Sequence, residues 1–156
     1  MPGTKGADRV EETVHGSAVA VGERGLLITG KAGAGKTSLA LELIAFGAEL
    51  VGDDRVHVAR DSGGGLTLTA PRNIAGMIEV RGFGLARLAA RPSATLSLIA
   101  DLDLAETDRL PERHERMLLG VACPVVLCKG RPGLASALTC LLRAAEWPAP
   151  DHFAGR

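Results

Sequence analysis

Short apolar runs separated by polar turns make up most of the 156-residue sequence, a pattern that predicts a β-rich domain with few helices. Residues 13–21 are mostly β-branched or small and apolar, and a turn joins them to the apolar run 26–29, so we expect a hairpin across this region. Leucine spacing predicts a largely buried helix at 36–46 that ends at Gly47. We expect further strands at 48–52, 55–60, 66–70, 78–84, 95–101 and 123–128, one helical turn at 74–77, and a second helix at 134–146.

A glycine-rich segment lies between the run at 26–29 and the predicted helix at 36–46. It matches the pattern G-x-x-x-x-G-K-[ST], and a position between a strand and a helix is the context in which this pattern binds phosphate. Glycines let backbone N–H groups turn toward phosphate oxygens, and the helix N-terminus adds partial positive charge. Lys36 can reach the β- and γ-phosphates of a nucleotide, and the Thr37 hydroxyl can bind a magnesium ion. The predicted phosphate-binding residues are Gly30, Lys31, Ala32, Gly33, Ala34, Gly35, Lys36 and Thr37.

Two acidic sites could serve such a phosphate-binding segment. Asp53 and Asp54 follow the predicted strand at 48–52. A right-handed crossover would make this strand parallel to the one before the glycine-rich segment, so both would end at the same edge of the sheet. Asp101 ends a later apolar strand, the position at which many P-loop ATPases carry a magnesium-binding aspartate. The pattern alone leaves both acidic sites open.

Three other polar residues carry weaker signals. His15 lies in the first strand, where a single histidine is more often structural or exposed than functional. Glu79 and Arg81 fall on one face of the predicted strand at 78–84, and neighbouring opposite charges of this kind often form an exposed ion pair. Spacing alone therefore assigns none of the three a function.

Composition narrows the class of protein. Lys and Arg number 18, as do Asp and Glu, and this zero net charge argues against a protein held to nucleic acid by bulk electrostatics. With one Trp, three Phe and no Tyr, an aromatic surface for stacking bases is not expected. The three cysteines form no C-x-x-C pair, which suits free thiols in a reducing cytoplasm. The polar N-terminus and the absence of a long apolar run predict neither a secretory signal nor a membrane span. We expect a flexible leader at 1–12, one domain at 13–147 and a flexible tail at 148–156.

Four segments follow one another in the order found in the catalytic domain of HPr kinase/phosphorylase, and the chain resembles that family. They are VHGSAVAV at 14–21, LLITGKAGAGKTSLALELI at 26–44, AELVGDDRVHV at 48–58 and IEVRGFG at 78–84. The last is similar to the family's own signature, which ordinary P-loop proteins lack. Looser similarity continues in DRL at 108–110 and KGRPGLA at 129–135. The family's usual N-terminal domain has no counterpart, so the sequence is similar to short forms that consist of the kinase domain alone.

The resemblance implies an α/β, P-loop nucleotide-binding fold with a mixed, largely β-rich sheet and few helices. It implies a cytoplasmic kinase that uses ATP and Mg²⁺ to phosphorylate a serine of an HPr-like phosphocarrier protein, and that also acts as its phosphate-dependent phosphorylase. Family members assemble as hexamers, so we expect a homo-hexamer that binds neither nucleic acid nor a membrane. At matching positions, the catalytic residues would be His15, Lys36, Asp53, Asp54 and Arg109, the magnesium ligands Thr37 and Glu79, and the residues of the dephosphorylation loop Lys129 and Arg131.

Some roles and two other functions stay open at this point. In the family, one aspartate of the pair takes the proton from the attacking serine and the other helps organise the metal, but the sequence does not divide these roles between Asp53 and Asp54. A generic P-loop ATPase or small-molecule kinase would instead use Asp101 as its metal ligand. A non-catalytic ATP-binding sensor is the third possibility. A GTPase is disfavoured because the guanine-reading motif N-K-x-D is absent.

Overall fold

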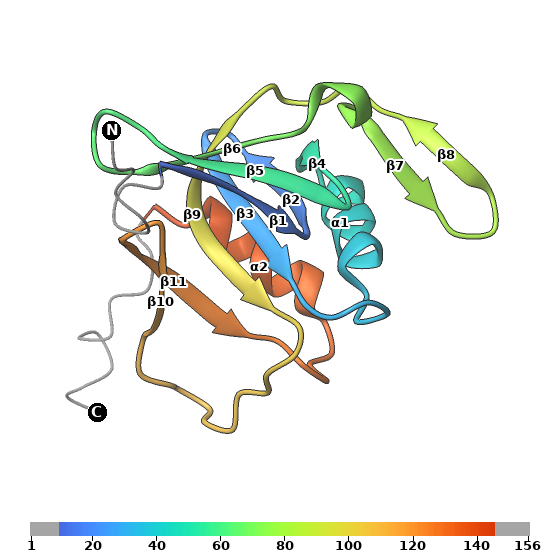
Figure 1. The fold of residues 1–156 in the computed structure, drawn as a ribbon. Helices are drawn as coiled ribbons and strands as arrows, with labels where there is room; N and C mark the ends of the chain where they lie inside the picture. The colour runs from blue at the N-terminus through green and yellow to red at the C-terminus, as the bar shows by residue number, and fades with distance from the viewer. Residues whose placement is uncertain (1–9, 146–156) are drawn as a thin grey trace.

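A mixed β-sheet forms the body of the protein in the computed structural model, which describes residues 10–145 (Figure 1). The main path of the nine-stranded sheet runs β1-β5-β6-β9-β3-β2-β4, with β11 paired to β9 and β10 paired to β11. Within the described residues, the mixed, β-rich sheet and the two α-helices agree with that part of the predicted fold class. The elements are β1 (Glu11–His15), β2 (Ser17–Val21), β3 (Arg24–Thr29), α1 (Lys36–Ala45), β4 (Glu49–Gly52), β5 (Arg55–Arg60), β6 (Leu66–Thr69), the 3₁₀-helix η1 (Arg72–Ile74), β7 (Met77–Val80), β8 (Gly84–Arg87), β9 (Ala94–Asp101), β10 (His114–Leu118), β11 (Val121–Leu127) and α2 (Leu134–Arg143).

The central strand β3 is buried on both faces because two separate apolar clusters cover it. Leu26 and Ile28 belong to the cluster beneath α1 and α2, whereas Leu27 belongs to a cluster on the opposite face. That second cluster is built from strands of the same sheet, among them β5, β6 and β11, which shows that the sheet curls over its own face (Figure 1). Each fully buried leucine contributes about 2 kcal/mol to folding. The apolar run before the glycine-rich segment is therefore rigidly held.

The helix α1 ends as the sequence predicts. Gly47 follows the last helical turn with φ of 105°, in the left-handed region that glycine adopts without strain. Its N–H donates to the Ile44 carbonyl at 2.9 Å, and the Ala48 N–H donates to the Leu43 carbonyl at 3.0 Å. This pair of hydrogen bonds is the Schellman motif, which turns the chain directly into β4.

Strands β3 and β4 point in the same direction, as the predicted crossover requires. They are not neighbours, because β2 lies between them and pairs antiparallel with both. The carboxyl ends of β3 and β4 consequently lie at one edge of the sheet. The central strand β9 is parallel to β3 and ends beside it, with Asp101 opposite Thr29.

The single strand predicted at 13–21 is wrong, because the chain breaks at Gly16 into β1 and β2. β1 pairs with β5 rather than with the strand after the turn, whereas β2 and β3 form the expected hairpin. A side chain at Gly16 would place its Cβ 2.5 Å from the Ile28 carbonyl oxygen. The close approach of these two backbones explains the glycine and the change of partner.

The strand predicted at 78–84 is also wrong. β7 ends at Val80, the chain turns through Arg81, Gly82 and Phe83, and β8 returns antiparallel to β7. Gly82 and Gly84 have φ of 85° and 126°, and these left-handed conformations let the chain reverse within the predicted strand. The result is a two-stranded hairpin that extends from the body of the protein (Figure 1).

The remaining expectations hold with changed boundaries. The predicted hairpin of β5 and β6 forms, and the helical turn predicted at 74–77 lies slightly earlier, at η1. A further strand, β10, was not predicted, and α2 ends three residues before the predicted 146. β1 begins at Glu11, inside the predicted leader, while residues 1–9 of that leader and the predicted tail lie outside the described residues. Within residues 10–145, no helix is long and apolar enough to cross a membrane.

Gly25 offers a test of the packing between β3 and β9. We expect Gly25→Ala to lower the free energy of unfolding by about 2 kcal/mol, because overpacking a tight site forces the backbone to shift. The new Cβ would lie 2.7 Å from the Thr95 carbonyl oxygen and 3.1 Å from the Ala94 Cβ. Urea denaturation followed by circular dichroism measures the change.

Gly22→Ala is the matched control, because it makes the same substitution in the adjoining turn. No atom lies within 4 Å of its new Cβ, so only the left-handed φ of 61° carries a cost, about 1 kcal/mol. Equal stability of Gly25→Ala and the wild-type protein would contradict the close packing.

Candidate active site

Residues 30–37 join β3 to α1 and form the glycine-rich turn. Gly33 and Gly35 have φ of 83° and 101°, conformations that a side chain would strain. Gly35 is the N-cap of α1, no side chain caps the helix, and its first turn contains no acidic residue. The N-terminal N–H groups and the positive end of the helix dipole are thus available to a phosphate.

Lys36 lies folded back over this turn. Its Nζ donates to the Gly30 carbonyl at 2.7 Å and to the Lys31 carbonyl at 3.0 Å. The ammonium group therefore occupies the middle of the glycine-rich segment, where it can exchange these carbonyls for phosphate oxygens. This is the position that the sequence predicts for a phosphate-binding lysine.

Asp53 connects the acid pair to the glycine-rich segment. Its carboxylate, only 7% exposed, accepts hydrogen bonds from the Thr37 hydroxyl at 2.9 Å and from the Ser17 hydroxyl at 2.6 Å. Both bonds go to Oδ1. The expected meeting of the two motifs at one sheet edge is thus present as a direct contact.

Ser17 belongs to this site although the sequence did not predict it. It opens the buried strand β2, and its neighbours in that strand are Ala and Val. A buried hydroxyl needs a hydrogen-bond partner, so a single serine in an otherwise apolar strand was the available signal. Its partner, Asp53, lies 36 residues away, and no local pattern identifies it.

Asp54 and His15 lie together at the outer side of the same edge. Asp54 has φ of 68° and a side chain that is 75% exposed, with Arg55 Nε at 3.8 Å from its carboxylate. Its carbonyl accepts the Gly16 N–H at 3.2 Å, which ties it to the residue after His15. His15 is exposed at the end of β1, opposite Arg55 on β5. The two aspartates thus differ: the Asp53 carboxylate is buried and accepts two hydrogen bonds, whereas the Asp54 carboxylate is exposed and, among the described residues, makes only a long ion pair with Arg55.

The alternative metal ligand Asp101 is already engaged in an ion pair. Burial raises the pKa of this carboxyl, but the hydrogen bond and charge of Arg116, together with the Asp103 N–H at 2.8 Å, lower it below its ordinary value overall. Arg116 comes from β10 and also reaches the Thr29 hydroxyl at 3.4 Å. Asp101 acts here as the anchor of an internal ion pair.

The structure does not bring the remaining predicted residues into contact with this edge. Glu79 is exposed on β7. Arg81 lies in the turn between β7 and β8, so it does not share a strand face with Glu79 as predicted. Arg109 is exposed in the connection between β9 and β10. Among residues 10–145, no group of three or more His, Cys, Asp or Glu side chains is arranged to hold a metal ion.

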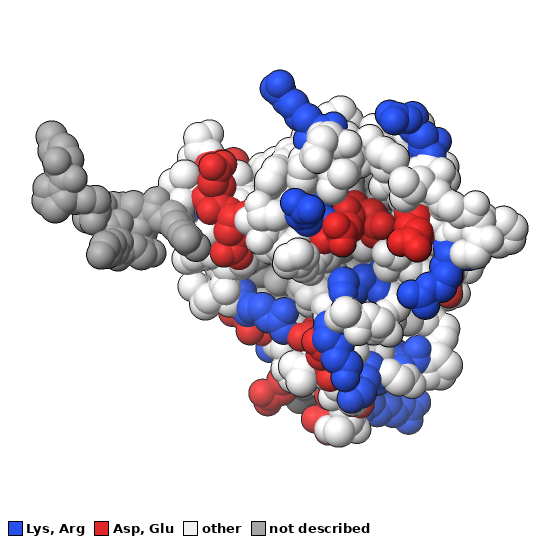
Figure 2. All heavy atoms as spheres, turned by 45° about the vertical axis from the view of Figure 1, so that its right-hand side comes forward, with Lys and Arg blue, Asp and Glu red and all other residues white. Residues whose placement is uncertain are grey.

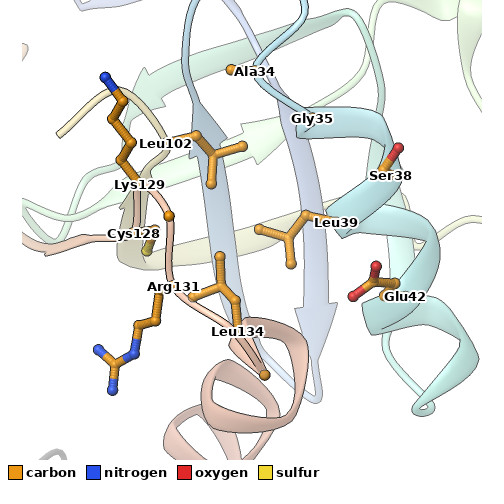
Figure 3. A pocket seen from close by; sticks show the side chains of 12 residues that line it. Ala34, Gly35, Ser38, Leu39, Glu42, Leu102, Cys128, Lys129, Arg131 and Leu134 are labelled. Carbon is orange, nitrogen blue, oxygen red and sulfur yellow. The ribbon is translucent and has the colours of Figure 1, made fainter. Parts of the chain in front are cut away.

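A pocket of about 330 Å³ opens beside the glycine-rich segment, between the start of α1 and the chain that leads into α2 (Figure 3). The side chains of Leu39, Leu102 and Leu134 point into it, and Lys129 and Arg131 lie at its outer side (Figure 3). Cys128 also lines it. Burial raises the pKa of this thiol to about 11, so the thiol stays protonated at neutral pH. All three cysteines are free, as predicted. The complete lining is Ala34, Gly35, Ser38, Leu39, Glu42, Leu102, Cys128, Lys129, Gly130, Arg131, Gly133 and Leu134.

Comparison with known proteins places this site in a family. Residues 9–133 match the family model described as HPr serine kinase C-terminal domain. The chain belongs to this family. The match spans the glycine-rich segment, the acid pair, the β7–β8 hairpin and the pocket-lining segment up to residue 133.

Curated relatives agree with the family model. The chain is 37% identical over 132 residues to an HPr kinase/phosphorylase of Geobacillus thermodenitrificans, covering 77% of the chain and 43% of that protein. It is 31% identical over 160 residues to the HPr kinase/phosphorylase of Brevibacillus brevis, covering 90% of the chain and 51% of the relative. The chain thus spans about half, or less, of the length of these curated relatives.

A solved structure shows the same fold. The HPr(Ser) kinase/phosphatase from Coxiella burnetii superimposes with a TM-score of 0.71 at 26% identity, over 85% of this chain and 88% of the solved chain. The similarity therefore extends over nearly the whole domain.

Removing the guanidinium of Arg116 tests the ion pair next to the glycine-rich segment. We expect Arg116→Ala to lower the free energy of unfolding by about 2 kcal/mol at neutral pH, since it leaves the buried Asp101 carboxylate without its cation. Because the pKa of Asp101 is lowered by folding, the ion pair stabilises the protein above the unfolded-state pKa. This stabilisation is lost as the pH falls through the lower folded-state value. Urea titrations at several pH values should therefore show the two proteins converging in strongly acidic buffer.

The control is to measure the effect of Arg116→Ala in two proteins, the wild type and the Asp101→Asn variant. If the ion pair is the cause, Arg116→Ala should cost much less in the Asp101→Asn protein. An equal cost in both backgrounds would mean that Arg116 stabilises the fold by packing alone.

Proposed function

We propose that this domain is an ATP-dependent kinase that phosphorylates a serine of an HPr-like phosphocarrier protein and can also run the phosphate-dependent reverse reaction. The observation that carries the proposal is the hydrogen bond from Thr37 to Asp53, which joins a P-loop to an acid pair in a member of this family. A phosphoryl donor and a proton acceptor can then lie at one edge of the sheet, where ligands bind in open α/β folds.

ATP would bind along the helix start and the neighbouring pocket. Its phosphate oxygens would accept hydrogen bonds from the N–H groups at the N-terminus of α1 and from the ammonium group of Lys36. Its nucleoside fits the pocket beside Leu39 and Leu102, which opens outside the carboxyl ends of β3, β9 and β11. The apolar floor and charged rim of this pocket are the usual features of a nucleoside site.

The Thr37 hydroxyl and the Asp53 carboxylate are the residues that would hold Mg²⁺. Oxygen ligands of this type suit the ion, and Oδ2 of Asp53 accepts no hydrogen bond among the described residues. Bound there, Mg²⁺ supplies positive charge to the phosphate oxygens. Glu79 matches a further ligand of the family, and the exposed hairpin that carries it would have to bring it toward this edge.

We assign different roles to the two aspartates, and their different burial and hydrogen bonding support this assignment. Asp53 is buried and holds Thr37 and Ser17, so it organises the site. Asp54 is exposed and free to accept the proton of the incoming serine hydroxyl. As the serine oxygen bonds to the γ-phosphorus, the bond from that phosphorus to the leaving ADP oxygen breaks. In the reverse reaction phosphate attacks phosphoserine, pyrophosphate forms, and Asp54 returns the proton to the serine oxygen.

Basic side chains complete the proposed mechanism. Lys36 and Arg109 stabilise negative charge on the transferring phosphoryl group, and His15 lies next to the acid pair. Arg109 belongs to a connection without helix or strand around it, so it can approach when the substrates bind. Lys129 and Arg131, at the rim of the pocket, would serve the reverse reaction.

We also propose a homo-hexamer, on the basis of the family resemblance. The exposed hairpin supports an assembly, because Phe83 is 92% exposed and Leu85 is 70% exposed. On the face shown in Figure 2, acidic and basic side chains lie interspersed, as the balanced composition leads one to expect. Light scattering should give six times the chain mass of 16.1 kDa.

The direct test of the proposed function is incubation of the protein with a purified HPr-like protein, Mg-ATP and, in a second step, inorganic phosphate. Mass spectrometry should find one phosphoserine after the first step and its loss after the second. Asp54→Asn should lower the rate of phosphorylation at least about 100-fold, since general base catalysis contributes factors of this size. Asp101→Asn should lower stability but keep most of the activity.

The other two functions predict different results. A generic P-loop ATPase or small-molecule kinase with Asp101 as its metal ligand would lose turnover in Asp101→Asn and keep it in Asp54→Asn. An ATP-binding sensor would bind Mg-ATP, but neither the wild-type protein nor either variant would phosphorylate a protein. The ion pair between Asp101 and Arg116 argues against the first of these alternatives, because the carboxylate already has a cationic partner.

A further inference from the structure

A short segment at the end of β9 lies along the base of the glycine-rich turn. The Leu102 N–H donates to the Thr29 carbonyl at 2.9 Å. The Lys31 N–H in turn donates to both carboxylate oxygens of Asp103, at 3.0 Å each. Thr29 at the end of β3 and Lys31 in the glycine-rich turn are therefore tied to residues 102 and 103.

This segment is itself anchored. The Asp103 N–H donates to Asp101 Oδ1 at 2.8 Å, and the other oxygen of Asp101 pairs with Arg116 from β10. A continuous series of contacts thus runs from Arg116 through Asp101 and Asp103 to Lys31. The packing is close as well, since a Cβ added at Gly30 would lie 3.1 Å from the Leu102 Cβ.

The contacts of Lys31 show why Asp103 matters for binding. Its carbonyl accepts hydrogen bonds from Lys36 Nζ and from the Ala34 N–H, both at 3.0 Å. Lys36 must leave that carbonyl when it turns to a phosphate, and the bond from Ala34 lies within the turn itself. Asp103 then provides the side-chain contact that still holds Lys31 to the rest of the protein. A carboxylate bound to an N–H is a charge-assisted hydrogen bond, stronger than an ordinary one.

We propose that Asp103 is a positioning residue, which holds the first half of the phosphate-binding turn in its binding conformation while Lys36 moves from the Lys31 carbonyl to the phosphates. This rests on the proposed function, since it assumes that the turn binds ATP. The negative charge of Asp103 would by itself repel phosphates, so its benefit to binding comes from the hydrogen bonds to Lys31. A rival role, in which the carboxylate occupies the turn and competes with phosphate, predicts the opposite effect of removing it.

Two substitutions separate these roles. Asp103→Ala removes the acceptor, and we expect the dissociation constant of Mg-ATP, measured by isothermal titration calorimetry, to rise about tenfold or more. Asp103→Asn keeps an acceptor oxygen and loses the charge, so its dissociation constant should stay within about threefold of the wild-type value. In the phosphorylation assay, Asp103→Ala should raise KM for ATP far more than it lowers kcat.

Glu112→Ala is the matched control, because Glu112 is exposed in the same connection between β9 and β10 and makes no hydrogen bond or ion pair among the described residues. It should bind Mg-ATP as the wild-type protein does, and thermal unfolding should show that all variants fold. Unchanged or tighter binding by Asp103→Ala would overturn the positioning role, and tighter binding would support competition. If the wild-type protein itself binds no Mg-ATP, the proposed function fails first and the role of Asp103 falls with it.

Discussion

The hydrogen bond between Thr37 and Asp53 is the contact on which the account of this protein depends. It joins two segments that the chain separates by a helix and a strand, at the edge where β3 and β4 both end. Neither segment alone defines a reaction, because a glycine-rich turn binds phosphate and an exposed aspartate accepts protons in many settings. Under the proposed function, their contact would place phosphate binding and proton transfer within one site. The buried Ser17 hydroxyl holds the same carboxylate oxygen and fixes this arrangement further.

The two acidic positions left open by the sequence have different surroundings in the folded protein. Burial raises the pKa of Asp101, but the Arg116 guanidinium and a backbone N–H lower it overall, and these contacts make Asp101 part of the framework beneath the glycine-rich turn. Asp54 keeps an exposed carboxylate at the outer side of the edge. The physical distinction lies in the partners that each carboxylate already has. The ion pair with Arg116 supports the proposal that Asp101 is not the metal ligand.

Local signals predicted the parts of the fold that form from neighbouring residues. The glycine-rich turn, the end of α1 at Gly47 and the β2–β3 hairpin all depend on short spacings, and the sequence predicted each of them. Errors arose where partners are distant in the chain. Gly16 splits a strand because its backbone meets Ile28, and β10 carries Arg116 to Asp101 across a long connection. The roles of Glu79 and Arg109 remain proposals, because both side chains are exposed and neither makes a hydrogen bond or ion pair with Asp53 or Asp54 in the part of the chain that the structure describes.

The most direct test of the central claim asks whether Thr37 and Asp53 act as one unit. Thr37→Val, Asp53→Asn and the double variant form a cycle in which the dissociation constant of Mg-ATP is measured for each protein. If the hydrogen bond joins them in one magnesium-nucleotide site, their effects will be non-additive by at least about 1 kcal/mol, because residues in contact share their interaction energy. Strictly additive effects would contradict the account and would separate the acid pair from the nucleotide site.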